Sequence, residues 1–194
     1  GSVTFSGTTN INDAVNFTAA SQTLTFKGDT SLDDGINLKG FASTLILDST
    51  PGNKTFTAVI STEGDNTGTL QVKGANTYTI ANAVGANGDA LSSVTIADSS
   101  NATFSSSVYA NSLTVGSGTT TFNANVTGAL ALGSTGSTVA FGDGVTMTGA
   151  ITNSSGAATG TINASGDFTA TSTIGDSGNG AISTFNVGAD NKVI

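Results

Sequence analysis

The sequence predicts an all-β protein built as a parallel β-solenoid, with coils whose length in residues is about 18–21. Three observations lead to this prediction. Short segments of alternating apolar and polar residues recur along the whole chain of 194 residues, as they do in half-buried strands. Thr, Gly, Ser and Asn, all weak helix formers, make up more than half of the chain. Finally, one apolar frame returns at a nearly constant interval, which is typical of stacked repeats.

Six short segments carry the clearest strand pattern. In each of them β-branched or other apolar residues dominate, and Gly, Asn, Asp or Ser follows within a few residues as a turn signal. Strands are therefore expected at residues 3–5, 24–26, 45–47, 94–96, 113–115 and 130–132. The single proline and the frequent Val, Ile and Thr argue against a disordered tail.

A Phe-x-x-x-Val frame indicates which kind of all-β chain this is. It occurs at residues 104–108, 122–126 and 141–145, so its phenylalanines recur at intervals of 18 and 19 in the numbering. A sandwich or a jelly roll would also contain short alternating strands, but its antiparallel strands would not repeat one frame at one interval. We therefore expect residues 1–194 to form a single solenoid of nine or ten coils, about 45 Å long. Phe and Val would fill its interior, and Thr, Ser and Asn would point outward.

In addition to the repeat of one coil length, the sequence contains a longer repeat that spans several coils. Three motifs occur twice in the same order: Asp-Gly-(Ile/Val)-x-(Leu/Met)-x-Gly, then Thr-Gly-Thr-(Leu/Ile), then a (Val/Ile)-Gly-x-x-Gly segment that leads into an apolar strand. They begin at residues 34, 67 and 84 in the first copy and at residues 143, 159 and 174 in the second. Duplication of a multi-coil block explains this order, with related blocks at about 24–97 and 139–187.

In these motifs the chain resembles the passenger repeats of bacterial autotransporters, most closely those of the rickettsial surface-cell-antigen type. The resemblance covers about residues 24–187. It implies a β-helical stalk that is secreted through an outer-membrane β-barrel and displayed at the bacterial cell surface, where such passengers act in adhesion or as a surface layer. The family has no catalytic motif to carry over. Since both termini look cut from a longer chain, we expect a segment of a longer surface protein, without its own signal peptide or barrel.

The composition removes several classes of function. The chain has no His, Cys or Arg, so a His-dependent triad, a Cys nucleophile, a His/Cys zinc site and an arginine clamp on phosphate are impossible within it. Five Lys against thirteen acidic residues give a formal charge of −8, which disfavours binding to nucleic acid and to anionic membranes. We therefore expect a non-enzymatic protein without a cofactor, and we assign no catalytic, cofactor-binding or metal-binding residue. No direct insertion into a membrane is expected.

The acidic turn residues and the Gly-x-x-Gly turns are the features nearest to a site. Asp29, Asp33 and Asp34 cluster around one turn and could hold Ca²⁺ through oxygen ligands. Neither the EF-hand spacing nor the nonapeptide calcium repeat is present, so solvated turn acids are the favoured interpretation. The Gly-x-x-Gly turns of the longer repeat lack the Lys and the following helix of a phosphate loop, and we expect ordinary turns there.

Thr-x-Thr pairs are frequent, and ice-binding solenoids place ranks of such pairs on one flat face. The pairs here begin at residues 23, 55, 77, 119, 146 and 169. Their spacings of 32, 22, 42, 27 and 23 do not keep one coil period, so the pairs need not share a face. Thr is also a good outward residue in any strand, and this simpler interpretation is favoured.

Three functions from different classes stay open. The first is a β-helical passenger stalk that acts in adhesion or surface display, with host cells or other surfaces as partners. The second is a self-assembling subunit of an extracellular layer or filament, because open coil ends expose strand edges that can pair with another copy. The third is an ice- or polysaccharide-binding solenoid. The first agrees with the resemblance and is the expected function.

Overall fold

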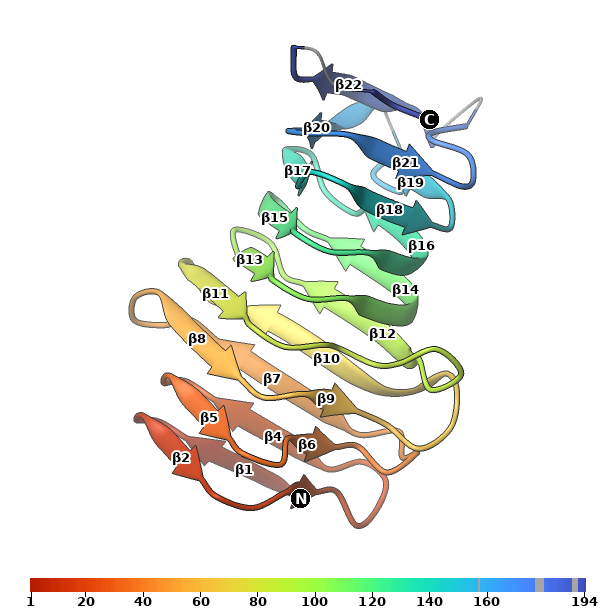
Figure 1. Cartoon of the computed structure of the whole chain (residues 1–194). Coiled ribbons are helices and arrows are strands. Elements are labelled where there is room, and N and C mark those ends of the chain that lie inside the picture. Colours follow the sequence, from red (N-terminus) through yellow and green to blue (C-terminus); the bar gives the residue numbers. More distant parts are fainter. Residues whose placement is uncertain (157, 177–179, 190–191) are drawn as a thin grey trace.

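The computed structural model describes residues 1–156, 158–176, 180–189 and 192–194. These residues form 22 strands and no helix, and therefore contain no helix long and apolar enough to cross a membrane. All strand-to-strand ladders among them are parallel. The chain winds into a solenoid of about nine turns (Figure 1). The predicted parallel β-solenoid is confirmed.

Three sheets run along the solenoid. The first sheet contains β1 (Ser2–Phe5), β4 (Thr23–Phe26), β7 (Thr44–Asp48), β10 (Thr67–Lys73), β12 (Leu91–Ile96), β14 (Val108–Val115), β16 (Val126–Leu132), β18 (Val145–Thr148), β19 (Ile151–Asn153) and β21 (Phe168–Ala170). The second sheet contains β2 (Thr9–Ile11), β5 (Thr30–Leu32), β8 (Lys54–Thr57), β11 (Thr77–Ile80), β13 (Asn101–Phe104), β15 (Gly118–Phe122), β17 (Ser137–Phe141), β20 (Thr159–Ala164) and β22 (Ile182–Val187). The third, short sheet contains β3 (Val15–Asn16), β6 (Ile36–Asn37) and β9 (Ile60–Ser61).

Each of the first three coils contributes one strand to each sheet, so like strands of successive coils stack on one another (Figure 1). Beyond β9, single-residue bridges from Ile60 to Val84 and from Val84 to Val108 continue the third sheet into β14. In β14 and β16 the third-sheet position of one coil and the first-sheet position of the next coil join into one long strand.

The six predicted strand segments are all strands, and all of them lie in the first sheet. Their apolar residues stand in one column of partners. From the second coil onward this column contains Leu24, Leu45, Leu70, Val94, Leu113, Leu130 and Ile151. The strands of the second sheet are less apolar and interrupted by Thr, which explains why the sequence pattern pointed to the first sheet.

The coil length varies more than expected. Along the column just described, the residue numbers of successive partners differ by 21, 25, 24, 19, 17 and 21, whereas the sequence predicted 18–21. Two coils are longer because their turns accept insertions, such as the loop around Pro51 between β7 and β8. Turns lie on the outside of a solenoid, so added residues there do not disturb the stacked interior.

Phenylalanines fill the interior, as predicted. Phe104, Phe122 and Phe141 are at most 1 % exposed, and the ring centroid of Phe122 lies 5.1 Å from that of Phe104 and 5.8 Å from that of Phe141. Phe168 continues this stack at 4.5 Å. Near the N-terminal end Phe5 stacks on Phe26, and Phe26 contacts Phe56 with their rings tilted by 50°. Offset aromatic stacking of this kind stabilises a pair by about 0.5–1.5 kcal/mol beyond the buried area.

The valines of the Phe-x-x-x-Val frame do not all share one column. Val108 pairs with Val126, as the frame predicts, but Val126 pairs next with Met147. Val145, the frame's third valine, pairs instead with Phe168. Phe122 pairs with Phe141, but Val126 follows Phe122 by four residues, whereas its partner Met147 follows Phe141 by six. The register therefore shifts by two residues here, and Met147 takes the place that the frame predicted for Val145.

The two copies of the longer repeat have similar local structure but lie in different sheets. In both Thr-Gly-Thr motifs the glycine has a positive φ, 69° at Gly68 and 82° at Gly160. A Cβ atom there would lie 2.4 Å from Leu38 and 2.3 Å from Leu132, so both glycines allow close packing on a leucine. However, the first motif begins β10 in the first sheet and the second begins β20 in the second sheet. Duplication of a block stays a prediction from the sequence.

Candidate functional site

The acidic turn residues hold neighbouring coils together. The carboxylate of Asp143 accepts a hydrogen bond from the backbone N–H of Asp167 at 2.9 Å, and the carboxylate of Asp167 accepts one from the N–H of Lys192 at 2.9 Å. Each carboxylate thereby satisfies a backbone donor in the next coil. This arrangement accounts for the two aspartates without a bound ion.

The three aspartates considered for calcium are not gathered into one cluster. Asp29 accepts a hydrogen bond from the backbone N–H of Thr55 at 2.8 Å, while Asp33 and Asp34 lie exposed in the turn after β5. Within the described ranges, no group of three or more acidic side chains is arranged to hold a metal ion. The structure therefore places these residues as turn acids.

Asparagines form the same type of contact without a charge. In each case the side-chain oxygen of an asparagine accepts a hydrogen bond from the backbone N–H of a threonine in the next coil. The pairs are Asn53 with Thr77 (3.0 Å), Asn101 with Thr119 (2.8 Å) and Asn125 with Thr146 (2.9 Å). These ladders explain how a chain with 9 % charged residues connects its turns.

Two exposed carboxylates have a lowered pKa, and each has a neighbouring donor. The hydrogen bond and ion pair with Lys39 lower the pKa of Glu63. The hydroxyl group of Ser134, which donates a hydrogen bond, lowers the pKa of Asp98, assisted by the backbone N–H of Ser117. Both side chains are solvent-exposed partners in turns, and neither has the raised pKa of a general acid.

Tyr78 makes a buried hydrogen bond to a coil that is not its direct neighbour. Its ring is completely buried, and its hydroxyl group donates a hydrogen bond of 2.7 Å to the backbone oxygen of Gly28, which lies 50 residues earlier. Burial raises the pKa of Tyr78 to about 12. The phenol therefore stays neutral and acts as a structural donor rather than as a base.

The first Gly-x-x-Gly segment is a turn, as predicted. Gly85 and Gly88 have φ angles of 67° and 87°, and Ala86 and Asp89 exchange two backbone hydrogen bonds of 3.1 Å across the turn. A strand, β12, follows it rather than a helix, so no helix N-terminus is available for a phosphate group. In the second segment, Gly178 lies outside the described residues.

The Thr-x-Thr pairs do not all share one face. The pairs that begin at residues 23, 146 and 169 lie in the first sheet, and those that begin at 55, 77 and 119 lie in the second. Thr79 pairs with Thr55 on one side and with Thr103 on the other, and Thr103 pairs with Thr121. The interval of 42 between the pairs that begin at 77 and 119 spans two coils of unequal length, with Asn101 and Thr103 between them. The spacing alone did not show this alignment within the second sheet, because the coils differ in length.

We define the Thr face as two columns of outward side chains on the second sheet. The first column is Thr77, Asn101, Thr119, Thr138, Thr161 and Thr184, and the second is Thr55, Thr79, Thr103, Thr121, Ala140, Asn163 and Asn186. The strand residues between them point inward and are buried, which gives β11, β13, β17 and β20 a regular in–out alternation.

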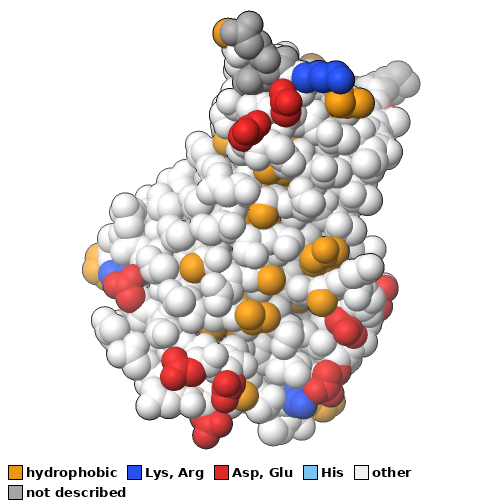
Figure 2. All heavy atoms as spheres, in the orientation of Figure 1, with side chains coloured by type: hydrophobic (Ala, Val, Ile, Leu, Met, Phe, Trp, Pro, Cys, Tyr) orange, Lys and Arg blue, Asp and Glu red, His pale blue; other side chains and the backbone are white. Residues whose placement is uncertain are grey.

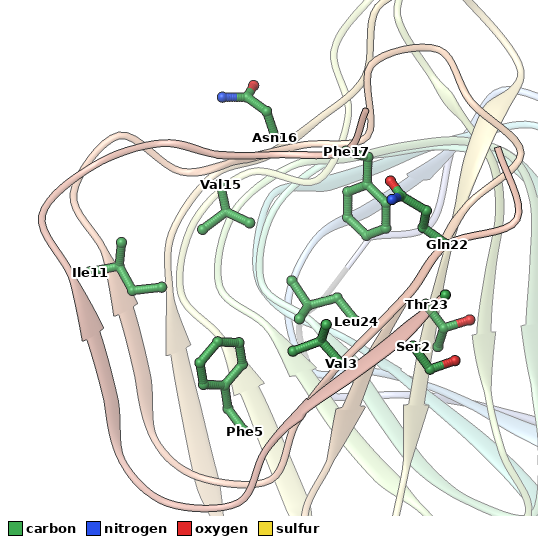
Figure 3. A pocket seen from close by; sticks show the side chains of 11 residues that line it. Ser2, Val3, Phe5, Ile11, Val15, Asn16, Phe17, Gln22, Thr23 and Leu24 are labelled. Atoms are coloured by element: carbon green, nitrogen blue, oxygen red, sulfur yellow. The ribbon is translucent and has the colours of Figure 1, made fainter. Parts of the chain in front are cut away.

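An apolar hollow opens at the N-terminal coil. It has a volume of about 330 Å³, and the side chains that line it include Val3, Phe5, Ile11, Val15 and Phe17 (Figure 3). They point toward one another as the core of the next coil does, but Val3 is 55 % exposed. The hollow is thus the unfilled end of the solenoid interior, and its lining has no ionisable side chain that could perform catalysis.

Comparison with protein-family models, with curated proteins and with solved structures gives no match. The geometry therefore assigns the chain to the class of parallel β-solenoids and to no particular family. The resemblance to autotransporter passengers rests on the sequence motifs alone.

Proposed function

We propose that this chain is a non-enzymatic β-helical stalk of a bacterial cell-surface protein, acting in adhesion or surface display. The observation that carries the proposal is the continuous in-register stacking of about nine coils around one apolar interior. A rod of this kind separates whatever it carries from the surface on which it stands. Its length grows with the number of coils, at about 4.8 Å for each.

The bonding within the rod is compatible with an extracellular location and with any other redox environment. The chain has no cysteine, so its stability depends on buried side chains and on hydrogen bonds between coils. Ser49 and Asn76 illustrate this: the Ser49 hydroxyl group donates to the backbone oxygen of Asn76 at 2.7 Å, and the Asn76 amide donates to the backbone oxygen of Ser49 at 2.9 Å. Such contacts are independent of the redox state of the compartment.

The proposal is tested by displaying the chain on bacteria, fused to an outer-membrane barrel, and by measuring adhesion to epithelial cells and to abiotic surfaces. We expect more attached cells than with the barrel alone, and protease-resistant rods in electron micrographs of the purified chain. The matched control is a Phe122→Asp fusion, which retains nearly the whole composition but loses the fold. Adhesion equal to that of the barrel alone, or compact particles in place of rods, would contradict the proposal.

A second candidate function is self-assembly into a layer or filament, favoured by apolar side chains on both terminal coils. Val3 and Phe5 are 55 % and 37 % exposed at one end, and Val187 is 42 % exposed at the other. Parallel strands point the same way in every copy, so head-to-tail stacking of a second copy would continue the sheets and would not close into a ring. Such a contact would cover the hollow at the N-terminal coil.

Sedimentation and electron microscopy over a concentration series distinguish this candidate from a monomeric stalk. Filaments that lengthen with concentration support self-assembly, and Phe5→Lys is then expected to abolish them. Val59→Lys is the matched control, because Val59 is 45 % exposed but lies between β8 and β9, away from both ends. Isolated rods at every concentration would exclude self-assembly by this route.

A further inference from the structure

The Thr face is a two-dimensional array of small uncharged side chains in which nine of the thirteen positions are Thr, three are Asn and one is Ala. Parallel pairing aligns its two columns over the strands from β8 to β22. Neighbouring strands are about 4.8 Å apart, and residues i and i+2 of one strand are about 6.6 Å apart. The array therefore has one repeat along the solenoid axis and one along the strands, as the surface of a crystal has.

The hydroxyl groups of this array are not used by the protein. Thr79, Thr103 and Thr121 hydrogen-bond through their side chains to no other residue in the described part of the chain, and the same holds for Thr119 and Thr138. All of them are at least partly accessible to solvent. Each side chain presents one methyl group and one hydroxyl group, so the face offers both apolar area and hydrogen bonds.

The Thr face is also free of charge. None of the thirteen positions that define it is Asp, Glu or Lys, although the chain carries a net charge of −8. Figure 2 shows charged side chains of the visible side near the two ends of the molecule and at its rims, with a middle region largely without them. A partner that matches this face is therefore uncharged and rich in hydrogen-bond donors and acceptors.

The outward columns of the first sheet differ from this pattern. One of them reads Thr4, Thr25, Ile46, Gln71, Thr95, Thr114, Ala131 and Thr152. Ile46 and Gln71 interrupt it with larger side chains. In the other column the hydroxyl groups of Thr69 and Ser93 are 3.2 Å apart and bond to each other. The hydroxyl group of Ser112, in the same column, donates to the backbone oxygen of Ser92. The first sheet therefore has fewer free hydroxyl groups side by side than the Thr face, and it provides an internal control.

We propose that the Thr face binds the ordered water of an ice surface. Ice is uncharged, repeats in two directions at spacings comparable to those of the array, and offers a donor or an acceptor at each oxygen. Threonine methyl groups fit between ordered waters while the hydroxyl groups replace some of them, which holds the water layer next to the protein.

A crystalline polysaccharide is the less suitable ligand. Flat sugar surfaces are bound mainly by exposed aromatic rings that stack on them, and the two columns contain no aromatic residue. The proposal does not depend on the stalk function, because ice binding requires the face alone and is measured on the purified chain.

The test compares ice recrystallisation inhibition and thermal hysteresis of the purified chain with those of two double variants. Thr103→Lys/Thr121→Lys places long charged side chains in the middle of the Thr face. Thr95→Lys/Thr114→Lys makes the same change in partnered residues of the first sheet, in the same two coils. We expect at least a tenfold higher concentration requirement for the first variant and a change of less than twofold for the second.

A third variant, Thr103→Val/Thr121→Val, retains the shape and the fold while removing the hydroxyl groups, and we expect it to reduce the activity less than lysine does. Circular dichroism confirms that each variant is folded. The proposal is overturned if the unmodified chain shows no ice activity, or if both lysine variants lose it equally. Binding of the unmodified chain to cellulose or chitin without ice activity would also overturn it and would assign the face to polysaccharide.

Discussion

At the scale of single residues, stability depends on large side chains that touch their counterparts in the coils above and below. Phe122 is completely buried between Phe104 and Phe141. In a solenoid such a residue has no alternative packing, because its neighbours are set by the register of two ladders. The buried polar groups are few, and Tyr78 connects coils that are not adjacent in the sequence.

Phe122→Asp is expected to prevent folding. Loss of the ring alone costs about 3–5 kcal/mol, and the buried carboxyl group adds the penalty of an unpaired polar group. Together these approach the whole stability of a domain of this size, about 5–15 kcal/mol. Circular dichroism and thermal melting measure the effect. The control is Asn123→Asp, which adds the same charge at the exposed neighbouring position, and an unchanged melting temperature for Phe122→Asp would show that the interior is misassigned.

Stability is expected to fall in strong alkali because of Tyr78. Its pKa is raised to about 12 in the folded chain from 10.0 in the unfolded one, so the unfolded chain loses this proton first. The contribution is complete below pH 10 and is lost as the pH rises toward 12. In a Tyr109→Phe variant Tyr78 is the single tyrosine, and tyrosinate absorbance then reports on it alone. A titration midpoint near pH 10 with the fold intact would contradict the buried position.

At the scale of elements, side-chain oxygens in the turns accept hydrogen bonds from backbone N–H groups of the next coil, where no backbone oxygen is available. Asp143 and Asp167 accept N–H groups from the next coil, and Asn53, Asn101 and Asn125 do the same elsewhere. These bonds lie outside the strands and continue the ladder into the loops. They explain why Asp and Asn recur at the turns of this chain.

Asp143→Asn is expected to change the melting temperature little, because the amide oxygen can accept the same hydrogen bond from Asp167. Asp143→Ala removes the acceptor and should cost about 1 kcal/mol. Chemical denaturation of both variants, with and without Ca²⁺, measures the difference. A strong loss with Asn together with a stabilising effect of Ca²⁺ on the unmodified chain would instead assign the carboxylate to a metal ion.

At the scale of the whole molecule, each coil contacts mainly its two neighbours, so stability is distributed along the axis. The strands at the two ends are poorly covered: β1 is exposed at all four residues, and β22 is exposed at five of six. In the middle, β10, β11, β13 and β17 bury every second residue. The rod therefore has a stable middle and weaker ends.

Hydrogen exchange is expected to be slowest in β10 to β17 and fastest in β1 and β22, because terminal coils open without disturbing the others. Exchange measured by mass spectrometry on peptides from each coil would show a gradient from the ends to the middle. Equal protection in all coils would mean that the solenoid opens as one cooperative unit. In that case the description by nearest neighbours would be wrong.

The sequence predicted the parts of this structure that depend on local pattern. Six strand segments were found, because their apolar residues are consecutive or alternate, and the phenylalanines of the repeated frame were correctly placed in the interior. The strands of the second sheet were not singled out, since Thr and Asn dominate their outward positions. The sequence did not predict the column that joins Thr79, Thr103 and Thr121, nor the partner of Val145, because both depend on coil length.

By itself, the sequence determined that the chain is all-β, that its strands stack in parallel and that the phenylalanines of the repeated frame point inward. These properties follow from the alternation of residue types and from their recurrence. The tertiary structure alone decided which residues of successive coils are partners. Which residues pair depends on the number of residues in each turn. Coils of unequal length can therefore be aligned only when the register of their strands is known. The columns of the Thr face exist at that level, since Thr79, Thr103 and Thr121 are separated by unequal stretches of chain and become neighbours only after the turns between them are folded.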